Sequence, residues 1–324
     1  MQILILGGAG FLGRRLAEAL ADRGTLRGEE IAQVALADAH DPSPVVAPFP
    51  VTTHPLDVAD RGAVDAMMAE GWDVIFHLAA VVSGEAERDF VKGMRANFFG
   101  TLNVLEAARA EANRPVLVFA SSVAVYGGAP PEPVQDWTAL NPQTSYGTQK
   151  AIGELLVNDY GRRGLVDGRG VRLPTVVVRP GKPNAAASSF FSGIIREPLQ
   201  GEPAICPVDP ATTAAWVASP RATIDNLIRA AELEAEALGT QRCFALPGLS
   251  VTVDTMLEAL QAEGGRAARE LVEVRRDPEI EAIVEGWVTS LETPKADALG
   301  MVRDPDYASI VRQFVEDELE GGEG

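Results

Sequence analysis

The sequence predicts an α/β fold: a doubly wound parallel sheet followed by a smaller, mostly helical C-terminal cap. Apolar segments of strand length alternate with helical patterns up to about Arg179. Parallel strands need such long crossovers, and the crossover helices cover both faces of the sheet. Beyond Arg179 the alternation stops. We therefore expect a sheet domain over residues 1–180, completed by later segments at about 210–250, and a cap formed mostly by residues 181–324.

The individual elements follow from the spacing of the apolar residues. Short apolar runs predict buried strands at Gln2–Leu6, Ile31–Ala37, Thr52–Leu56, Asp73–Leu78, Val116–Ala120 and Thr175–Val178. Helical spacing predicts helices at Phe11–Arg23, Gly62–Ala69, Glu85–Ala112 and Tyr146–Arg162, and in the cap at Ser188–Leu199, Thr223–Leu238, Val253–Ala262 and Tyr307–Leu319. A short strand is expected near Arg242–Leu246, an edge loop over Pro42–Pro55 and a frayed acidic tail over Glu316–Gly324.

Composition argues against several classes of protein. With 28 basic and 46 acidic residues the net charge is −18, so neither nucleic acid nor an anionic membrane is expected as the main partner. Cys206 and Cys243 are far apart, which argues against a disulfide framework. The histidines also lack the spacing of metal ligands; they are His40, His54 and His77. No apolar run approaches the ~18 residues of a membrane span, and glycines interrupt the apolar start where a signal peptide would continue, so we expect a cytoplasmic protein.

A glycine-rich turn, Gly7–Gly13, joins the first predicted strand to the first helix. Its spacing suits a tight turn, a close backbone approach to a pyrophosphate and a helix N-terminus aimed at the anion. Such a turn alone often binds no ligand. Here, however, the next strand ends at Asp38, whose carboxylate can accept both ribose hydroxyls and would repel a 2′-phosphate. Asp57 and Val58 follow the third strand and can hold an adenine, so these features favour NAD over NADP.

Tyr146 and Lys150 are four residues apart and share one face of a predicted helix. A tyrosine with a pKa of about 10 is a poor base at neutral pH, but a nearby ammonium and a charged nicotinamide ring would lower that pKa. Ser121 and Ser122 close a buried strand, at the sheet edge where open α/β sheets bind ligands. A tyrosine–lysine pair alone usually marks a solvated helix face. Together with the serine and the glycine turn, it predicts an acid–base site.

In these motifs the chain resembles the extended short-chain dehydrogenase/reductase family, which includes nucleotide-sugar epimerases and dehydratases. The matching segments are Gly7–Gly13, Asp38, Asp57–Val58, His77–Ala80, Asn97–Asn103, Ser121–Gly127 and Tyr146–Lys150. The resemblance implies a Rossmann-like fold that binds NAD through Gly7, Gly10, Phe11, Leu12, Gly13, Asp38, Asp57, Val58, Leu78, Ala79, Ala80, Asn97, Tyr146 and Lys150.

The same resemblance implies a role for each catalytic residue. Ser122 would orient the substrate hydroxyl, and Tyr146 would be the acid/base. Lys150 would hold the nicotinamide ribose and tune Tyr146. Asn97 would lie near the proton path or brace the site, the alternative being an amide that only packs between helices.

Two departures from the family pattern narrow the chemistry. Dehydratases of the family carry an Asp-Glu pair after the catalytic hydroxyl, where this chain has Val123 and Ala124, so dehydration is not expected. The segment Arg172–Leu199 lacks the turn typical of epimerases and resembles a branch that oxidises a four-carbon sugar acid at C2. We therefore expect NAD-dependent oxidation of a small sugar acid by hydride transfer. A nucleotide-sugar epimerase with tightly bound NAD and a non-catalytic NAD-binding regulatory protein remain alternatives.

A small sugar acid needs hydroxyl groups and a cation around it rather than a nucleotide groove. The expected substrate-binding residues are Ser83, Ser122, Tyr146, Thr175, Arg179 and Ser188. Further candidates are Lys182, Ser189, Arg196 and Arg221. An ordinary surface ion pair is the commoner role of any one of these arginines.

Two of the predicted helices carry more apolar surface than one sheet face needs. The stripes consist of Phe90, Met94, Phe98, Leu102 and Leu105 on Glu85–Ala112, and of Ile152, Leu155 and Leu156 on Tyr146–Arg162. Members of the resembled family commonly pair these helices between subunits, which implies a two-fold homodimer through a four-helix bundle. The alternative is that both stripes belong to the core.

Overall fold

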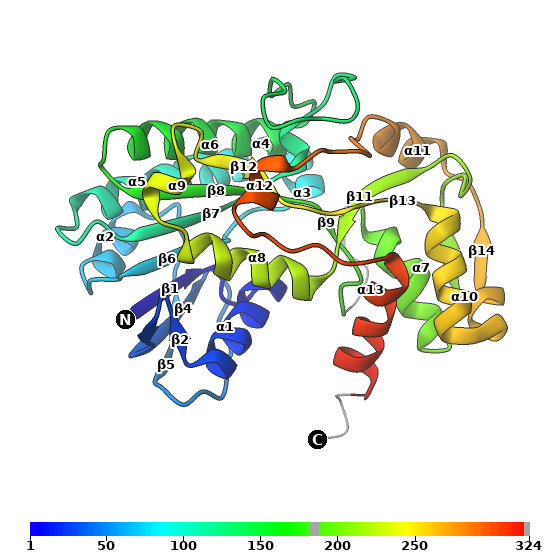
Figure 1. The fold of residues 1–324 in the computed structure, drawn as a ribbon, viewed down its shortest axis with the longest axis horizontal. Helices are drawn as coiled ribbons and strands as arrows, with labels where there is room; N and C mark the ends of the chain where they lie inside the picture. The colour runs from blue at the N-terminus through cyan, green and yellow to red at the C-terminus, as the bar shows by residue number, and fades with distance from the viewer. Residues whose placement is uncertain (182–187, 321–324) are drawn as a thin grey trace.

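A seven-stranded parallel sheet forms the centre of the molecule and confirms the predicted doubly wound α/β fold (Figure 1). The computed structural model describes residues 1–181 and 188–320. From one edge to the other the strands are β12 (Cys243–Ala245), β8 (Asp167–Leu173), β7 (Val116–Ser122), β6 (Val74–His77), β1 (Gln2–Leu6), β4 (Gln33–Asp38) and β5 (Val51–Pro55). The chain order reverses between β1 and β6, and open sheets bind ligands at the carboxyl ends of the strands beside such a reversal.

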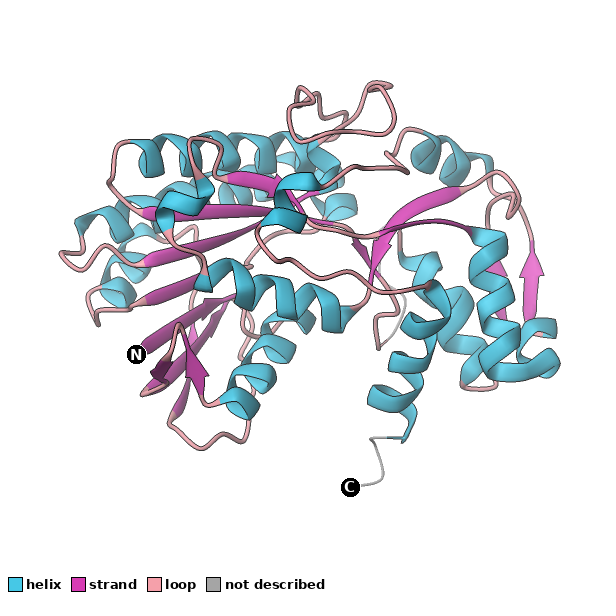
Figure 2. Ribbon diagram, viewed as in Figure 1, coloured by secondary structure: helices cyan, strands magenta, loops and turns pink. Residues whose placement is uncertain are grey.

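Helices cover both faces of the sheet (Figure 2). α1 (Phe11–Arg23) and α8 (Pro220–Glu232) pack on one face; α2 (Arg61–Met68), α5 (Thr101–Ala110) and α6 (Ser145–Arg162) pack on the other. Alternate residues of β1 serve the two cores: Ile3 and Ile5 pack with α1 and α8, whereas Leu4 and Leu6 pack with the opposite layer. A strand buried on both faces needs this continuous apolar run, which is why the central strands were predictable.

The prediction of the strand after β7 is wrong. The apolar run Thr175–Val178 contributes only the short β9 (Thr175–Val176), which belongs to a small sheet of the cap. The segment that pairs with β7 is Asp167–Leu173, which contains three charged residues and two glycines and has no continuous apolar run.

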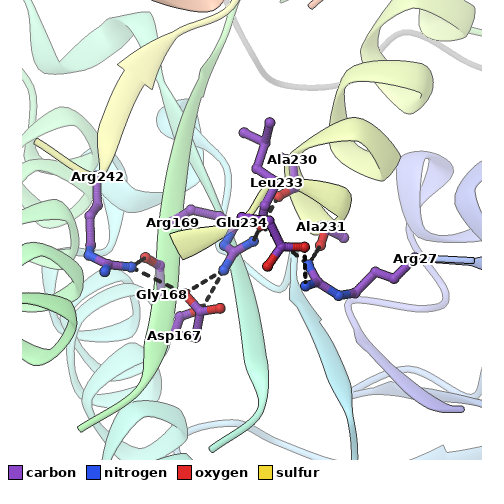
Figure 3. Close-up of polar contacts among 9 residues, drawn as sticks. All are labelled: Arg27, Asp167, Gly168, Arg169, Ala230, Ala231, Leu233, Glu234 and Arg242. Carbon is purple, nitrogen blue, oxygen red and sulfur yellow. Dashed lines mark hydrogen bonds and ion pairs between the residues drawn. The ribbon is translucent and has the colours of Figure 1, made fainter. Parts of the chain in front are cut away.

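Buried arginines explain how so polar a segment can lie inside the sheet. Arg169 is fully buried; its guanidinium pairs with Asp167 and donates to the carbonyl oxygens of Ala230 and Leu233, beside the C-terminal end of α8 (Figure 3). Arg27 and Arg242 complete the cluster, binding Ala231 and Asp167 respectively. Because helix carbonyls and a carboxylate satisfy these charges, their burial is tolerated.

Several predicted helices are interrupted or displaced. Glu85–Ala112 breaks at Asp89, with φ −125° and ψ 83°, because the Asp89 carboxylate caps a new helix start at Lys92 N, 2.9 Å away. The pieces are α3 (Ser83–Arg88), α4 (Phe90–Gly93), a π-helical segment (Met94–Gly100) and α5. Thr223–Leu238 divides into α8 and α9 (Ala235–Leu238), and Val253–Ala262 extends to α10 (Val253–Glu270) across a break at Gly265.

The cap is helical, as predicted, and contains small sheets that the sequence did not indicate. Its helices are α7 (Ser189–Leu199), α10, α11 (Pro278–Glu285) and α13 (Tyr307–Phe314). β11 (Ala214–Ala218) pairs with β9 and β13 (Leu249–Thr252), and β10 (Ala204–Cys206) pairs with β14 (Val272–Val274). These elements share a hydrophobic core of their own, which includes Phe191, Met256 and Phe314.

The remaining differences are small. A hairpin, β2 (Thr25–Leu26) and β3 (Glu29–Glu30), precedes β4, and α12 (Pro294–Ala298) packs against β12. The edge loop predicted over Pro42–Pro55 ends before β5 begins at Val51. The tail does not fray from Glu316, since a π-helical segment (Val315–Glu320) continues α13; residues 321–324 lie outside the described chain.

Candidate active site

The glycine turn forms an anion cradle between β1 and α1. Gly7 has a φ of 95°, and a Cβ at Gly13 would lie only 2.2 Å from the Gly7 carbonyl oxygen, so the close packing of strand and helix requires glycine at both positions. α1 begins without a side-chain cap, and its first residues line a cavity of about 450 Å³. Backbone N–H groups at such a helix start suit a pyrophosphate. The cradle therefore fits the dinucleotide that the sequence predicted.

Asp38 ends β4 beside this cradle. Its carboxylate accepts hydrogen bonds from Ala9 N at 3.2 Å and His40 N at 2.9 Å, which fix its orientation. It borders a second cavity, of about 590 Å³, together with other predicted NAD-binding residues. These residues are Asp57, Val58, Leu78, Ala79 and Ala80. The cavity has the position and the acceptor that an adenosine half of NAD requires.

Ser122, Tyr146 and Lys150 converge on the 450 Å³ cavity, although β7 and α6 are separated along the chain by a long loop. Thr144 caps α6 by accepting from Gly147 N at 3.0 Å, so the helix begins directly before Tyr146. The Ser122 side chain lies within reach of Tyr146 and lowers the pKa of its phenol. Its hydroxyl oxygen also accepts a hydrogen bond from Ala124 N at 3.1 Å. The Lys150 ammonium donates to the Ala120 carbonyl oxygen at 2.8 Å and lies 5.7 Å from the centre of the Tyr146 ring.

Burial dominates the electrostatics of these residues. It raises the pKa of Tyr146 to about 12, against a smaller lowering by the Ser122 side chain. Burial also lowers the pKa of Lys150 to about 7, and the Glu154 carboxylate opposes that change. The pKa of Tyr146 therefore moves in the direction opposite to the one predicted from Lys150. Among the protein's own groups, desolvation of the phenolate outweighs its neighbours.

The predicted substrate-binding residues also reach the cavity. Ser83, Thr175 and Ser188 line it near Tyr146. The Arg179 guanidinium lies 3.5 Å from the Ser188 hydroxyl; burial and the nearby Arg196 charge lower its pKa. Among the described residues, no carboxylate forms an ion pair with Arg179. This side chain is therefore a cation available to an anionic ligand.

The other candidate cations are engaged elsewhere or cannot be placed. Arg196 lines the cavity, but its guanidinium donates to the Arg179 carbonyl oxygen at 2.7 Å and pairs with Glu197 at 2.5 Å. Arg221 is exposed and pairs with Asp317, so it is a surface ion pair and not part of the cavity wall. Ser189 lines the cavity. Lys182 lies outside the described residues.

Asn97 is buried but lines none of these cavities. Its amide oxygen accepts from Val81 N at 2.8 Å, and its amide nitrogen donates to Val81 O at 3.0 Å and to Gln149 Oε1 at 2.7 Å. The side chain thus joins the segment after β6 to α6, beside Lys150. These are the contacts of a brace, one of the roles considered from the sequence.

The sequence did not indicate a third cavity, of about 650 Å³, that shares Ser122 and Tyr146 with the first. Its additional wall residues include Tyr126, Trp216, Ile283 and Trp287. Trp216 is on β11 and Ile283 on α11, two elements that the sequence analysis did not predict. Ser83, Thr175 and Ser188, which were expected to bind substrate, line this cavity as well. Tyr126 stood inside the Ser121–Gly127 motif and received no role.

The described part of the chain contains no group of three or more His, Cys, Asp or Glu side chains able to hold a metal ion. Over the same residues, no helix is both long and apolar enough to cross a membrane.

Comparison with known proteins identifies close relatives. The model of the NAD dependent epimerase/dehydratase family matches residues 3–213. The D-erythronate dehydrogenase of Cupriavidus necator is 49% identical over 322 residues, 98% of each chain, and that of Haemophilus influenzae is 40% identical over 98% of this chain and 100% of its own. A crystal structure described as a nucleoside-diphosphate-sugar epimerase, from Agrobacterium tumefaciens, superposes with a TM-score of 0.95 at 42% identity, over 99% of this chain and 95% of that one.

Proposed function

Since the chain belongs to the NAD-dependent epimerase/dehydratase family of extended short-chain dehydrogenases/reductases, we propose that it oxidises D-erythronate at C2 to 2-dehydro-D-erythronate. NAD is the cofactor. The observation that carries the proposal is one cavity lined by the glycine cradle, by Tyr146 with Ser122 and Lys150, and by Arg179, which has no carboxylate partner among the described residues. A hydride-transfer site for a small acid needs these three components together.

Each component has a proposed task. Bound in the cradle, NAD supplies the hydride acceptor. Tyr146 takes the proton of the C2 hydroxyl. When the substrate is bound, Ser122 turns its single hydroxyl proton from Tyr146 to the same substrate oxygen and orients it. Lys150 holds the nicotinamide ribose and favours the tyrosinate through its charge. Arg179, with Ser83, Thr175 and Ser188 around it, binds the carboxylate and hydroxyl groups of the sugar acid.

The direct test is a screen of C4–C6 sugar acids with NAD, followed at 340 nm. We expect NADH to accumulate with D-erythronate and not with UDP-sugars. Epimerisation of a UDP-sugar without release of NADH would instead support the epimerase alternative. NAD binding without turnover of either class would favour the regulatory one.

Arg179→Gln is expected to raise the KM for the sugar acid about tenfold or more, because a charge-assisted contact to the carboxylate is lost. The Kd for NAD should change little. Arg221→Gln is the matched control, since Arg221 is also an arginine of the C-terminal half but pairs with Asp317 at the surface. An equal rise in KM for both variants would contradict the role of Arg179.

Cofactor choice tests Asp38. The enzyme should prefer NAD to NADP by at least tenfold in kcat/KM, which is about 1.4 kcal/mol. The carboxylate accepts the ribose hydroxyls and repels a 2′-phosphate. Asp38→Ala should remove most of this preference. Equal efficiency of the wild-type enzyme with both cofactors would contradict the assignment.

A two-fold homodimer is also proposed, with the π-helical segment and α6 at its interface. On these elements the large apolar side chains of Phe99 and Leu155 are 49% and 65% exposed, which is what an uncovered interface would leave. Leu105 of the predicted stripe, by contrast, belongs to the core. Light scattering at micromolar concentration should give about twice 34.3 kDa, and Leu155→Glu should give a monomer. Ile205→Glu, at an exposed apolar site in the cap, should remain dimeric. A wild-type monomer would refute the dimer.

The proposed location is the cytoplasm, where thiols stay reduced. Cys206 and Cys243 are both free and buried, which suits that compartment. The small sugar acid is the proposed partner, and the charge of −18 disfavours nucleic acid and anionic membranes.

A further inference from the structure

A cluster of buried polar side chains lies behind the catalytic residues. Arg172 and Glu154 are 4% and 1% exposed and form a two-pronged ion pair with N–O distances of 2.7 to 3.1 Å. The Ser121 hydroxyl donates to the same carboxylate at 2.5 Å. Another nitrogen of Arg172 donates to the Tyr126 hydroxyl, also at 2.5 Å. None of these contacts has a role in the mechanism above.

The members of this cluster are attached to the elements that carry the catalytic residues. Glu154 is four residues after Lys150, so one turn of α6 separates them. Ser121 directly precedes Ser122 at the end of β7. The Glu154 carboxylate is therefore a direct link between the strand end that carries Ser122 and the helix that carries Tyr146.

A buried ion pair is not required to stabilise this junction. Desolvating two charges costs several kcal/mol, and well-packed apolar residues of the same volume often stabilise a core equally well or better. An apolar pair, however, cannot fix the orientation of the two elements through directional hydrogen bonds. Here the carboxylate accepts from Ser121 and from Arg172 in a fixed arrangement, which restricts how β7 and α6 can move relative to each other.

We propose that Glu154, held by Arg172, is a positioning residue that sets the place of Ser122 relative to Tyr146 through Ser121. This inference rests on the proposed function, in which Tyr146 is the catalytic acid/base. Ser122 favours the phenolate of Tyr146, so a strand end that shifts away from α6 loses that support. Without the link, the Tyr146 pKa should rise and the rate at a given pH should fall.

Other charged groups near Tyr146 define what the test must hold constant. The titratable and charged residues that line its two cavities are Glu87 and Arg88 of α3, Tyr126, Lys150, Arg179, Arg196 and Glu279. Behind Lys150 stands His77 of β6, whose pKa burial and the Lys150 charge lower to about 3, so it is neutral. Ser121→Ala changes none of these groups and leaves no buried charge unpaired.

The first experiment needs no sugar acid. The chain has four tyrosines, so the tyrosinate absorbance of the NAD-bound enzyme minus that of the same protein with Tyr146→Phe reports the titration of Tyr146. We expect its midpoint to rise by about 0.5–1 pH unit in Ser121→Ala and in Arg172→Lys. Arg169→Lys is the matched control, because Arg169 is equally buried in the same strand but binds the carbonyls beside α8. Its midpoint should not move.

The second experiment measures kcat and the Kd for NAD at one pH. Ser121→Ala and Arg172→Lys should lose about three- to tenfold in kcat with unchanged NAD binding. The kcat of Arg169→Lys should stay within about twofold of the wild type, even if its Tm falls as much as that of Arg172→Lys. Unchanged titration and kcat in Ser121→Ala would overturn the proposal, and so would equal losses in the two arginine variants. If the wild type oxidised no sugar acid, the proposed function would fail, and the titration alone would still decide the role of Glu154.

Discussion

Replacing Tyr146 by phenylalanine is expected to lower kcat by about 10²–10⁴-fold, the usual contribution of a positioned general base. The substitution keeps the ring and its packing and removes only the oxygen that is proposed to take the substrate proton. The Kd for NAD should stay within about twofold, because the cradle, Asp38 and Lys150 are untouched. The measurement is kcat against pH with D-erythronate, together with NAD binding.

The matched control is Tyr160→Phe. Tyr160 is on the same helix, its pKa is also raised to about 12 by burial and by the Glu106 carboxylate, and it lines none of the three cavities described. Its loss should leave kcat within about twofold of the wild type. If Tyr146→Phe kept more than a tenth of wild-type kcat, Tyr146 would not be the base and the proposed mechanism would be wrong.

Lys150→Met is expected to lower kcat about 10²–10³-fold and, unlike Tyr146→Phe, to weaken NAD binding as well. Methionine keeps an apolar stem beside the Phe119 ring, whose centre lies 4.9 Å from the ammonium, but it removes the charge and the donor. Burial, opposed by the smaller effect of Ser122, raises the Tyr146 pKa to about 12. In the proposed mechanism the nicotinamide charge and the Lys150 ammonium together lower this pKa when NAD is bound. Without the lysine, the rising limb of the kcat profile should therefore shift to more alkaline pH.

Lys295→Met controls for the loss of a lysine that donates to backbone carbonyls. Lys295 donates to the Leu238 carbonyl oxygen at 2.8 Å, and burial lowers its pKa too, but it lies outside the cavities around Tyr146. Its replacement should affect stability and leave the pH profile in place. A Lys150→Met enzyme with wild-type NAD affinity would refute the ribose-binding role.

The parts of the fold that could be predicted are those encoded in one stretch of chain. Gln2–Leu6 and Phe11–Arg23 have the bounds expected, because an apolar strand, a glycine turn and an amphipathic helix follow one another directly. β8 could not be predicted, since its buried Arg169 depends, besides Asp167, on carbonyls more than sixty residues away. The helix break at Asp89 could not be predicted either, because the apolar stripe continues across it and only the local Asp89 cap marks the new helix start.

The candidate site also has a part that the sequence predicts and a part that it does not. Tyr146 and Lys150 share one helix face because of their spacing, and Ser122 ends a strand at the ligand-binding edge of the sheet. Their convergence could therefore be expected. The different roles proposed for Arg179 and Arg221 depend on their partners, and Asp317, which engages Arg221, is 96 residues further along the chain. Trp216 lines the 650 Å³ cavity only because β11 pairs with β9 and β13, and these long-range pairings leave no periodic signal in so short a strand.

The path of the chain between sheet and cap limits how this enzyme could be recombined with its relatives. After β8 the chain builds α7, β10 and β11 of the cap, then returns to the sheet for α8 and β12. The next helix, α10, belongs to the cap. Leu299 and Met301 then pack in the sheet core, whereas Tyr307 and Phe314 pack in the cap core. No single crossover point separates the two cores, so a chimera joined once near residue 180 would combine halves of two interleaved cores. Exchanging substrate specificity between relatives would instead require grafting individual wall segments, such as the one that carries Trp216.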